Sequence, residues 1–169
     1  MITPDYVRLM AQYNRWQNAS AFGAAGSLSD AARRQDRGAF FRSIHETLAH
    51  ILAADELWLS RFGACAAPDR NLAQSAARYE GWDALATARG RMDDIISDWA
   101  AAVGPGDLSG ELSWYSGMMA RQMKRPLGLL IAHVFNHQTH HRGQVHAMLT
   151  AAGAKPQDTD IPFMPGLEG

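Results

Sequence analysis

The stretch that decides the fold is residues 126–153, PLGLLIAHVFNHQTHHRGQVHAMLTAAG. Apolar residues recur in it at three- and four-residue steps, which predicts one apolar stripe along an α-helix. Five of the seven histidines of the protein also fall inside it: His133, His137, His140, His141 and His146. The sequence therefore places a cluster of imidazoles on a helix that faces a core.

His137 and His141 are the histidines of this cluster that are best placed to act together. On a wheel of about 3.6 residues per turn they fall within or beside the apolar stripe, whereas His133 lies at its edge and His140 and His146 point away. Histidines at i and i+4 lie one above the other, so their ring nitrogens can converge on one point. A divalent metal there would satisfy both rings. The alternative is that each ring hydrogen-bonds a neighbour inside an ordinary core.

The bulk composition is that of an ordinary globular protein. The chain has 169 residues, enough for one domain with a sizeable core, and we expect a single domain over residues 1–169. The formal net charge is -1, so we expect no nucleic acid and no anionic membrane as a partner. No apolar run approaches the about 18 residues of a membrane-spanning helix. The N-terminal segment is too polar for a secretory signal, so we expect a cytoplasmic protein.

The single cysteine, Cys65, narrows the chemistry of any site. Disulfides within the chain and cysteine-based zinc clusters are excluded, so a metal site must draw on His, Asp and Glu. Cys65 lies in FGACAAPD, which we interpret as a loop, and no histidine is near it in sequence. We therefore favour a structural role over a catalytic thiol.

The first helix begins at a strong set of start signals. Thr3 supplies a capping hydroxyl, Pro4 suits the first helical position and Asp5 is an acid in the first turn. We expect this helix to run to about residue 25. Asn14 and Asn18 fall away from its apolar face, and we expect them to be solvated.

A short helical turn and a second long helix follow. Ser29 and Asp30 predict a capped turn that ends at Arg34, and apolar spacing predicts a helix from about Gly38 to Phe62. A third long helix is expected over residues 82–103, and a short turn of helix somewhere in the polar stretch 71–81.

The second long helix carries three polar residues whose roles the wheel leaves open. Asp55 falls on the apolar stripe, where a carboxylate is unusual. It could orient a ligand histidine or pair with an arginine of a neighbouring helix. His45 and His50 lie on opposite flanks of the stripe, and the wheel does not choose between them as a third metal ligand.

Residues 107–125 lack a helical face, and we interpret them as a β-hairpin or an extended crossover. The tail after residue 156 is expected to lie extended on the surface, pinned by Ile161, Phe163 and Met164. Four long amphipathic helices predict an all-α four-helix bundle with a long crossover before the last helix. That crossover argues against a simple up-down order.

The chain resembles the DinB-like family of helical-bundle proteins, which are regarded as candidate metalloenzymes. The resemblance covers most of the chain. It rests on YNRWQNA (13–19), SIHETLAHILAADELWLSRF (43–62), HVFNHQTHHRGQVHAMLTAAGAKP (133–156) and the tail DTDIPFMP (158–165).

The resemblance implies a three-histidine metal site. The family takes one ligand from the second long helix, which matches His50 in LAHIL, and an i, i+4 pair from the last helix, which matches His137 and His141 in NHQTHH. Three imidazoles suit several divalent ions, and we expect Zn first and Ni second. Family members are commonly homodimers, which implies a homodimer here.

The resemblance also implies a class of chemistry. Three neutral histidines leave a fourth position open on a tetrahedral metal, as in catalytic sites. Some relatives transfer or isomerise with a low-molecular-weight thiol, so we expect an enzyme that activates such a thiol for attack on an electrophilic small-molecule substrate. Asp55 and Arg142 are candidates for groups that orient a ligand or the substrate. Metal-dependent hydrolysis is the enzymatic alternative, and a stress-associated metal-binding protein without turnover is the non-catalytic one.

Overall fold

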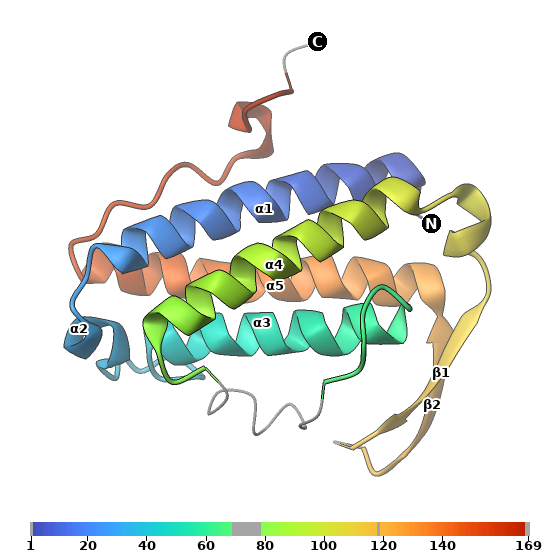
Figure 1. The fold of residues 1–169 in the computed structure, drawn as a ribbon, viewed down its shortest axis with the longest axis horizontal. Helices are drawn as coiled ribbons and strands as arrows, with labels where there is room; N and C mark the ends of the chain where they lie inside the picture. Colours follow the sequence, from blue (N-terminus) through green and yellow to red (C-terminus); the bar gives the residue numbers. More distant parts are fainter. Residues whose placement is uncertain (1, 69–78, 118, 168–169) are drawn as a thin grey trace.

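The chain folds as a bundle of long helices with one small β-hairpin (Figure 1). The structure, a computed structural model, describes residues 2–68, 79–117 and 119–167. The bundle consists of α1 (Pro4–Gly26), α3 (Ile44–Arg61), α4 (Trp82–Ala102) and α5 (Leu127–Ala151). The short elements are α2 (Asp30–Arg34), η3 (Pro105–Leu108), β1 (Glu111–Ser116), β2 (Arg121–Pro126) and η4 (Ile161–Phe163). The predicted fold class, including the hairpin before the last helix, is confirmed.

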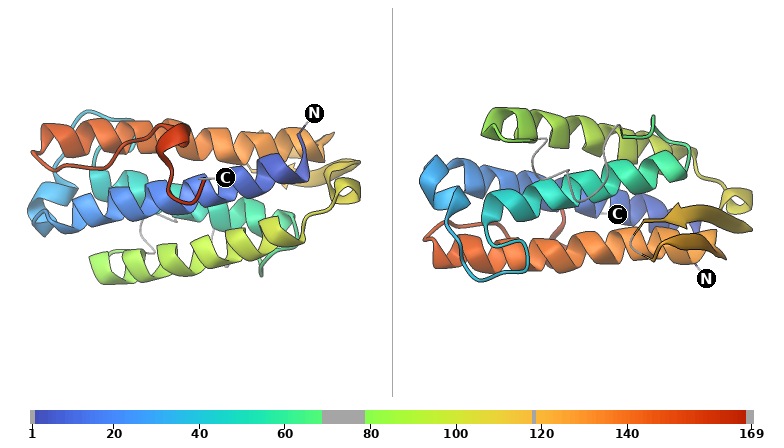
Figure 2. Two further views of the ribbon diagram at one scale, coloured as in Figure 1. Left: turned by 90° about the horizontal axis from the view of Figure 1, so that it is seen from above. Right: turned by 90° about the horizontal axis from the view of Figure 1, so that it is seen from below.

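The four long helices do not follow a simple up-down order. α1 packs on α4 and α5, and α3 packs on the same two helices, so α1 and α3 lie diagonally across the bundle. α1 and α5 run in one direction and α3 and α4 in the other (Figures 1 and 2). The prediction of a complex order is therefore confirmed. The consecutive helices that run parallel are α3 and α4, however, and not the pair that flanks the hairpin.

α3 begins six residues later than the sequence pattern predicts. Ser43, not Gly38, starts it: the Ser43 hydroxyl accepts a hydrogen bond from the backbone N–H of Glu46 at 3.1 Å and donates to the Glu46 carboxylate at 3.1 Å. Arg42, immediately before the cap, has a positive φ of 64° that a helix does not tolerate. The Ser43 side-chain cap thus sets the boundary. The other two predicted caps, Thr3 and Ser29, are confirmed.

Asn14 and Asn18 are buried, so the prediction that they are solvated is wrong. Asn14 is 0% exposed and Asn18 is 1% exposed. Asn18 donates a hydrogen bond to Asp93 of α4 at 2.8 Å and accepts a long one of 3.5 Å from Arg142 of α5. The charged groups that these neighbouring helices bring into the interior give the Asn18 amide partners that the sequence of α1 does not reveal.

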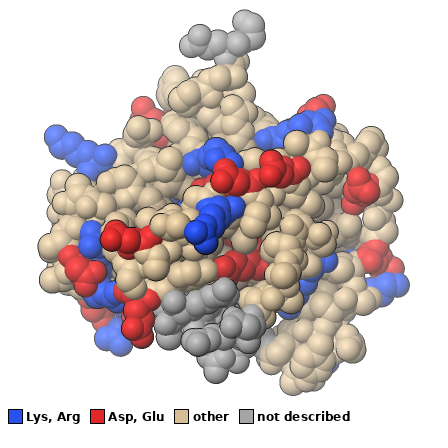
Figure 3. All heavy atoms as spheres, viewed as in Figure 1, with Lys and Arg blue, Asp and Glu red and all other residues tan. Residues whose placement is uncertain are grey.

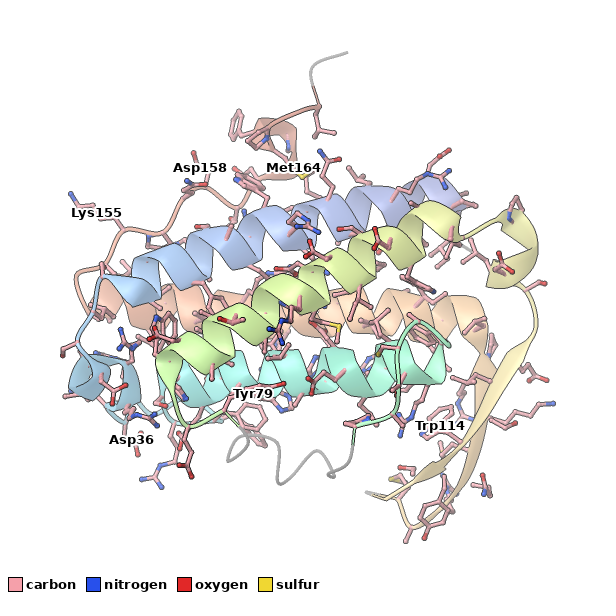
Figure 4. All side chains as sticks on the ribbon, in the orientation of Figure 1. Asp36, Tyr79, Trp114, Lys155, Asp158 and Met164 are labelled. Atoms are coloured by element: carbon pink, nitrogen blue, oxygen red, sulfur yellow. The ribbon has the colours of Figure 1, made fainter. Side chains whose placement is uncertain are left out.

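The C-terminal tail runs back along α1, as Figures 1 and 4 show. Tyr13 donates its hydroxyl proton to the carbonyl of Thr159 at 2.8 Å, and the Gln17 amide donates to the carbonyl of Asp158 at 2.8 Å. Met164 is buried, as predicted, but Phe163 is 66% exposed and does not pin the tail. Side chains of α1 that bond the tail backbone hold it instead.

The described surface has no dominant charge. Acidic and basic side chains are interspersed on the face in Figure 3. Within the described residues, none of the helices combines the length and the apolar character needed to cross a bilayer. The helical turn expected within 71–81 falls largely on residues 71–78, which lie outside the described part of the chain.

Candidate metal centre

Three histidines from α3 and α5 converge at the contact between these two helices. Nε2 of His50 lies 3.1 Å from Nε2 of His137, and one ligand nitrogen of each of His50, His137 and His141 lies within 4.8 Å of the others. The ring centroids are 4.4 to 5.1 Å apart. All three residues that the resemblance implies as ligands are thus brought together.

Helix geometry explains why these three rings meet. His137 and His141 are one turn apart on α5, so their side chains stack along one face. α3 runs antiparallel to α5 beside it, as the right-hand view in Figure 2 shows, and turns the His50 flank toward that face. His45 is on the other flank of α3, where its Nε2 lies 2.7 Å from the carbonyl oxygen of Tyr79. The structure therefore distinguishes between the two histidines that the wheel left open.

Two further residues, which the sequence analysis did not single out, orient the imidazoles. The Gln144 side-chain oxygen lies 2.8 Å from Nδ1 of His141 and can only accept a hydrogen bond, so Nδ1 carries the proton and Nε2 keeps its lone pair. The ring of Phe41 stacks on His50, with centroids 3.8 Å apart. Gln144 could have been found from its i+3 spacing to His141. Phe41 could not, because it lies in the turn that the sequence pattern assigned to a helix.

The three rings are neutral at neutral pH. Burial and, to a smaller extent, the proximity of His141 lower the pKa of His50 to about 4. Burial and the neighbouring histidines lower the pKa of His137 to about 3. The pKa of His141 is also lowered, again mainly by burial. Neutral imidazole is the form that binds a metal. The three histidines can therefore bind an ion without first releasing protons.

The donor set and its spacing fit a divalent ion. Two nitrogens that each lie about 2.0–2.1 Å from a tetrahedral zinc are roughly 3.3 Å apart. The separation of 3.1 Å between Nε2 of His50 and Nε2 of His137 is close to that value. Two ring nitrogens that face each other need either a shared proton or a shared ion. A nitrogen of His141 lies nearby as the third of the set, which favours the ion.

Asp55 takes part in a buried charge network and makes no hydrogen bond to the three histidines. Its carboxylate accepts hydrogen bonds from Arg89 of α4 and Gln138 of α5, and Arg89 also pairs with Asp93 at 2.9 Å. Burial raises the pKa of the Asp55 carboxyl, and the charge of Arg89 offsets part of that effect. Of the two roles that the sequence left open, the arginine pair is the one observed.

Arg142 also lies away from the three histidines. Its guanidinium is buried beside α1, 5.5 Å from the ring of Tyr13, and donates long hydrogen bonds of 3.5 Å to Asn18 and 3.4 Å to Thr139. Burial lowers its pKa to about 10, so it remains a cation. It lines a cavity of about 340 Å³ between α1, α5 and the tail, on the opposite side of α5 from the histidines.

The remaining histidines of α5, His133, His140 and His146, do not join the cluster. His133 lies one turn before His137, with ring centroids 5.8 Å apart, and His140 lies beside His141 at 4.9 Å. His146 lines the cavity next to Arg142. The Cys65 thiol lies 3.8 Å from the carbonyl of Glu56, and burial raises its pKa, which is the opposite of what an activated nucleophile needs.

Two comparisons with known sequences match most of the chain. The sequence model of the DinB family matches residues 1–168. Protein DinB from Bacillus subtilis (strain 168) is 26% identical over 162 residues, which cover 92% of this chain and 91% of that protein. No solved structure gives a significant match.

Proposed function

The chain belongs to the DinB family, and we propose that it is a metal-dependent enzyme in which His50, His137 and His141 hold one divalent ion, Zn before Ni. The observation that carries the proposal is the convergence of these three ring nitrogens within 4.8 Å. The neutral state of all three rings supports it, because protonated rings would repel a cation.

We further propose that the ion activates a low-molecular-weight thiol. Three imidazoles contribute no negative charge, and none of the described Asp or Glu side chains joins the cluster. A divalent ion held there would keep its full positive charge, and it would supply a position that favours a thiolate over the thiol. A thiol at this position would lose its proton to solvent more readily and could form a bond to an electrophilic carbon, from which the leaving group would depart with the bonding electron pair.

The protein's own residues fix the geometry of this step. Gln144 holds His141 in the tautomer that directs Nε2 at the centre, and the Phe41 ring restricts rotation of His50. Metal-dependent hydrolysis would use the same three ligands but calls for a general base beside the attacking water. The described cluster contains no carboxylate to act as that base, which is why we place thiol activation first.

Elemental analysis of untagged protein tests the metal site. We expect about one ion per chain in the wild type and a loss of that ion in His137→Ala. His146→Ala is the matched control, because it removes an imidazole from the same helix on the opposite side. Equal metal content in all three proteins, or no uptake of Zn or Ni by the wild type, would contradict the proposal. A metal-loaded protein without thiol transferase activity would instead favour a metal-binding protein without turnover.

Four broader expectations remain proposals. We propose that residues 1–169 form one domain, that the protein is a homodimer and that it acts on a small-molecule substrate in the cytoplasm. Light scattering of the purified protein decides the oligomeric state, with a mass of twice 18.5 kDa expected for the dimer.

A further inference from the structure

We propose that the cavity between α1, α5 and the C-terminal tail is a second binding site, which takes a small carboxylic acid with its carboxylate at Arg142 and its hydrocarbon arm along the tail. The cavity has a volume of about 340 Å³, at the lower end of the volumes usual for small-molecule sites. It lies on the opposite side of α5 from the three histidines, so the inference does not depend on the metal-dependent function.

The tail forms the roof of this cavity. The left view of Figure 2 shows the tail above the junction of α1 and α5, and Thr159 of the tail lines the cavity. Side chains of α1 hold the roof in place. The Tyr13 hydroxyl donates to the carbonyl of Thr159 at 2.8 Å, and Ser20 Oγ accepts a hydrogen bond from the N–H of Gln157 at 2.8 Å. These polar groups of the cavity wall are therefore already used to bind the tail.

Arg142 is a cation in the cavity wall whose own hydrogen bonds are weak. It is 6% exposed. Its guanidinium donates to Asn18 at 3.5 Å and to Thr139 at 3.4 Å, both longer than the about 2.7–3.2 Å of a well-formed bond. Thr139 also lines the cavity, so the weakly bonded Nη2 lies at the cavity wall. Arg142 thus has donor capacity that the fold does not use.

No carboxylate of the described chain forms an ion pair with Arg142. The buried carboxylates of Asp55 and Asp93 pair with Arg89 instead. A buried cation is stabilised by a hydrogen-bonded anion, and a guanidinium can bind a carboxylate through two parallel hydrogen bonds. The carboxylate of a ligand in the cavity would supply this missing partner.

A second, more open hollow adjoins the cavity and suits the apolar arm of the ligand. The two share three lining residues, Tyr13, Thr139 and Thr159. Met10 and Phe163 line the second hollow, and Phe163 is 66% exposed. A hydrocarbon arm packed there would remove apolar surface from water. Asp160 lines the same hollow and would repel a carboxylate, which fixes the direction in which the acid binds.

Calorimetric titration of the full chain with three probes tests the inference. Hexanoate carries both the carboxylate and the apolar arm, hexanol lacks the charge, and inorganic phosphate lacks the arm. We expect the wild type to bind hexanoate about tenfold more tightly than hexanol, the usual effect of a charge-assisted hydrogen bond, and Arg142→Met to remove that difference. Absence of hexanoate binding, equal affinity for hexanoate and hexanol, or phosphate binding as tight as that of hexanoate would overturn the inference.

Filling the cavity gives a second test, which still applies if Arg142→Met does not fold. Gly143 lines the cavity, and a Cβ at this position would meet nothing within 4 Å beyond its own helix backbone. Gly143→Leu should therefore occupy the cavity without disturbing α5 and abolish hexanoate binding. Gly90→Leu is the matched control, because Gly90 is an equally open helix position on α4 that does not line the cavity. Unchanged hexanoate binding by Gly143→Leu would refute the site.

A third variant separates this inference from the proposed function, because a carboxylate can also coordinate a metal ion. His137→Ala removes a proposed metal ligand on the other side of α5 and should bind hexanoate as tightly as the wild type. That result, together with a wild type that takes up no metal, would sink the proposed function and sustain the carboxylate site. Loss of hexanoate binding in His137→Ala would assign the acid to the metal and overturn the inference.

Discussion

Nε2 of His50 and Nε2 of His137 lie 3.1 Å apart although 87 residues separate them in the chain. The contact exists because α3 and α5 pack side by side in opposite directions (Figure 2), which brings the turn of α3 that carries His50 against the turn of α5 that carries His137. The predictions below follow from this contact and from the groups that surround it.

Zinc should stabilise the wild type against heat and should not stabilise His50→Ala. A ligand that binds only the folded state adds about 2.7 kcal/mol to the free energy of unfolding when its free concentration is 100 times Kd. Loss of the α3 ligand leaves only two imidazoles and removes most of that gain. Differential scanning fluorimetry with and without Zn²⁺ measures this stabilisation as a shift in the unfolding temperature. His146→Ala should behave like the wild type, and a similar zinc response in His50→Ala would argue against the three-ligand site.

Gln144→Ala should weaken metal binding while the three ligands stay in place. The Gln144 oxygen accepts a hydrogen bond from Nδ1–H of His141, with an N···O distance of 2.8 Å, and thereby fixes the tautomer. Removing such a partner of a ligand histidine typically costs about 10–100-fold in metal affinity. Competition with a chromophoric chelator gives the affinity. Asn136→Ala, an exposed position of the same helix, should leave it unchanged, and equal effects of both variants would assign the loss to the helix rather than to Gln144.

The metal-free protein should lose stability as the pH falls from about 7. The folded pKa of His137 is about 3 and that of His50 about 4, both below the ordinary histidine pKa of 6.5. Between those values the unfolded chain binds protons that the folded state does not, so acidification favours unfolding, and the loss is complete once the folded rings protonate. Burial raises the pKa of Asp55, so protonation of this carboxyl favours the folded state as the pH falls and opposes the effect of the histidines.

Urea unfolding of wild type and His137→Asn between pH 7 and pH 4 isolates the contribution of His137, because the effect of Asp55 is present in both proteins. The wild type should lose more stability over this range than the variant. Parallel pH profiles would show that the His137 pKa is not depressed in the folded state.

Asp55→Asn should destabilise the fold strongly and leave the metal content unchanged. The substitution deprives the buried Arg89 of one of its two carboxylates, and breaking a buried ion pair from one side costs about 3–5 kcal/mol. Asp94→Asn, which breaks the exposed pair with Arg15, should cost less than about 1 kcal/mol. Denaturant titration measures both. A stable Asp55→Asn protein that binds metal poorly would instead make Asp55 a positioning group for the histidines.

The sequence by itself determined the features that depend on neighbours along the chain. Periodicity located α1, α4 and α5, the hydroxyls of Thr3 and Ser29 marked two helix starts, and the i, i+4 spacing paired His137 with His141. These signals are local because a helix repeats about every 3.6 residues and its first turn is capped by adjacent side chains. The family resemblance added His50, which no local rule distinguished from His45.

Only the tertiary structure decided which faces of different helices meet. The antiparallel packing of α3 on α5 brought His50 to the pair and sent His45 to Tyr79. Arg89 and Asp93 of α4 contact Asp55 and Asn18, and the four side chains form one buried network. Asn18 is therefore buried and not solvated as expected. The physical reason is that a buried polar group takes whatever partner packing places beside it, and that partner can lie anywhere in the sequence.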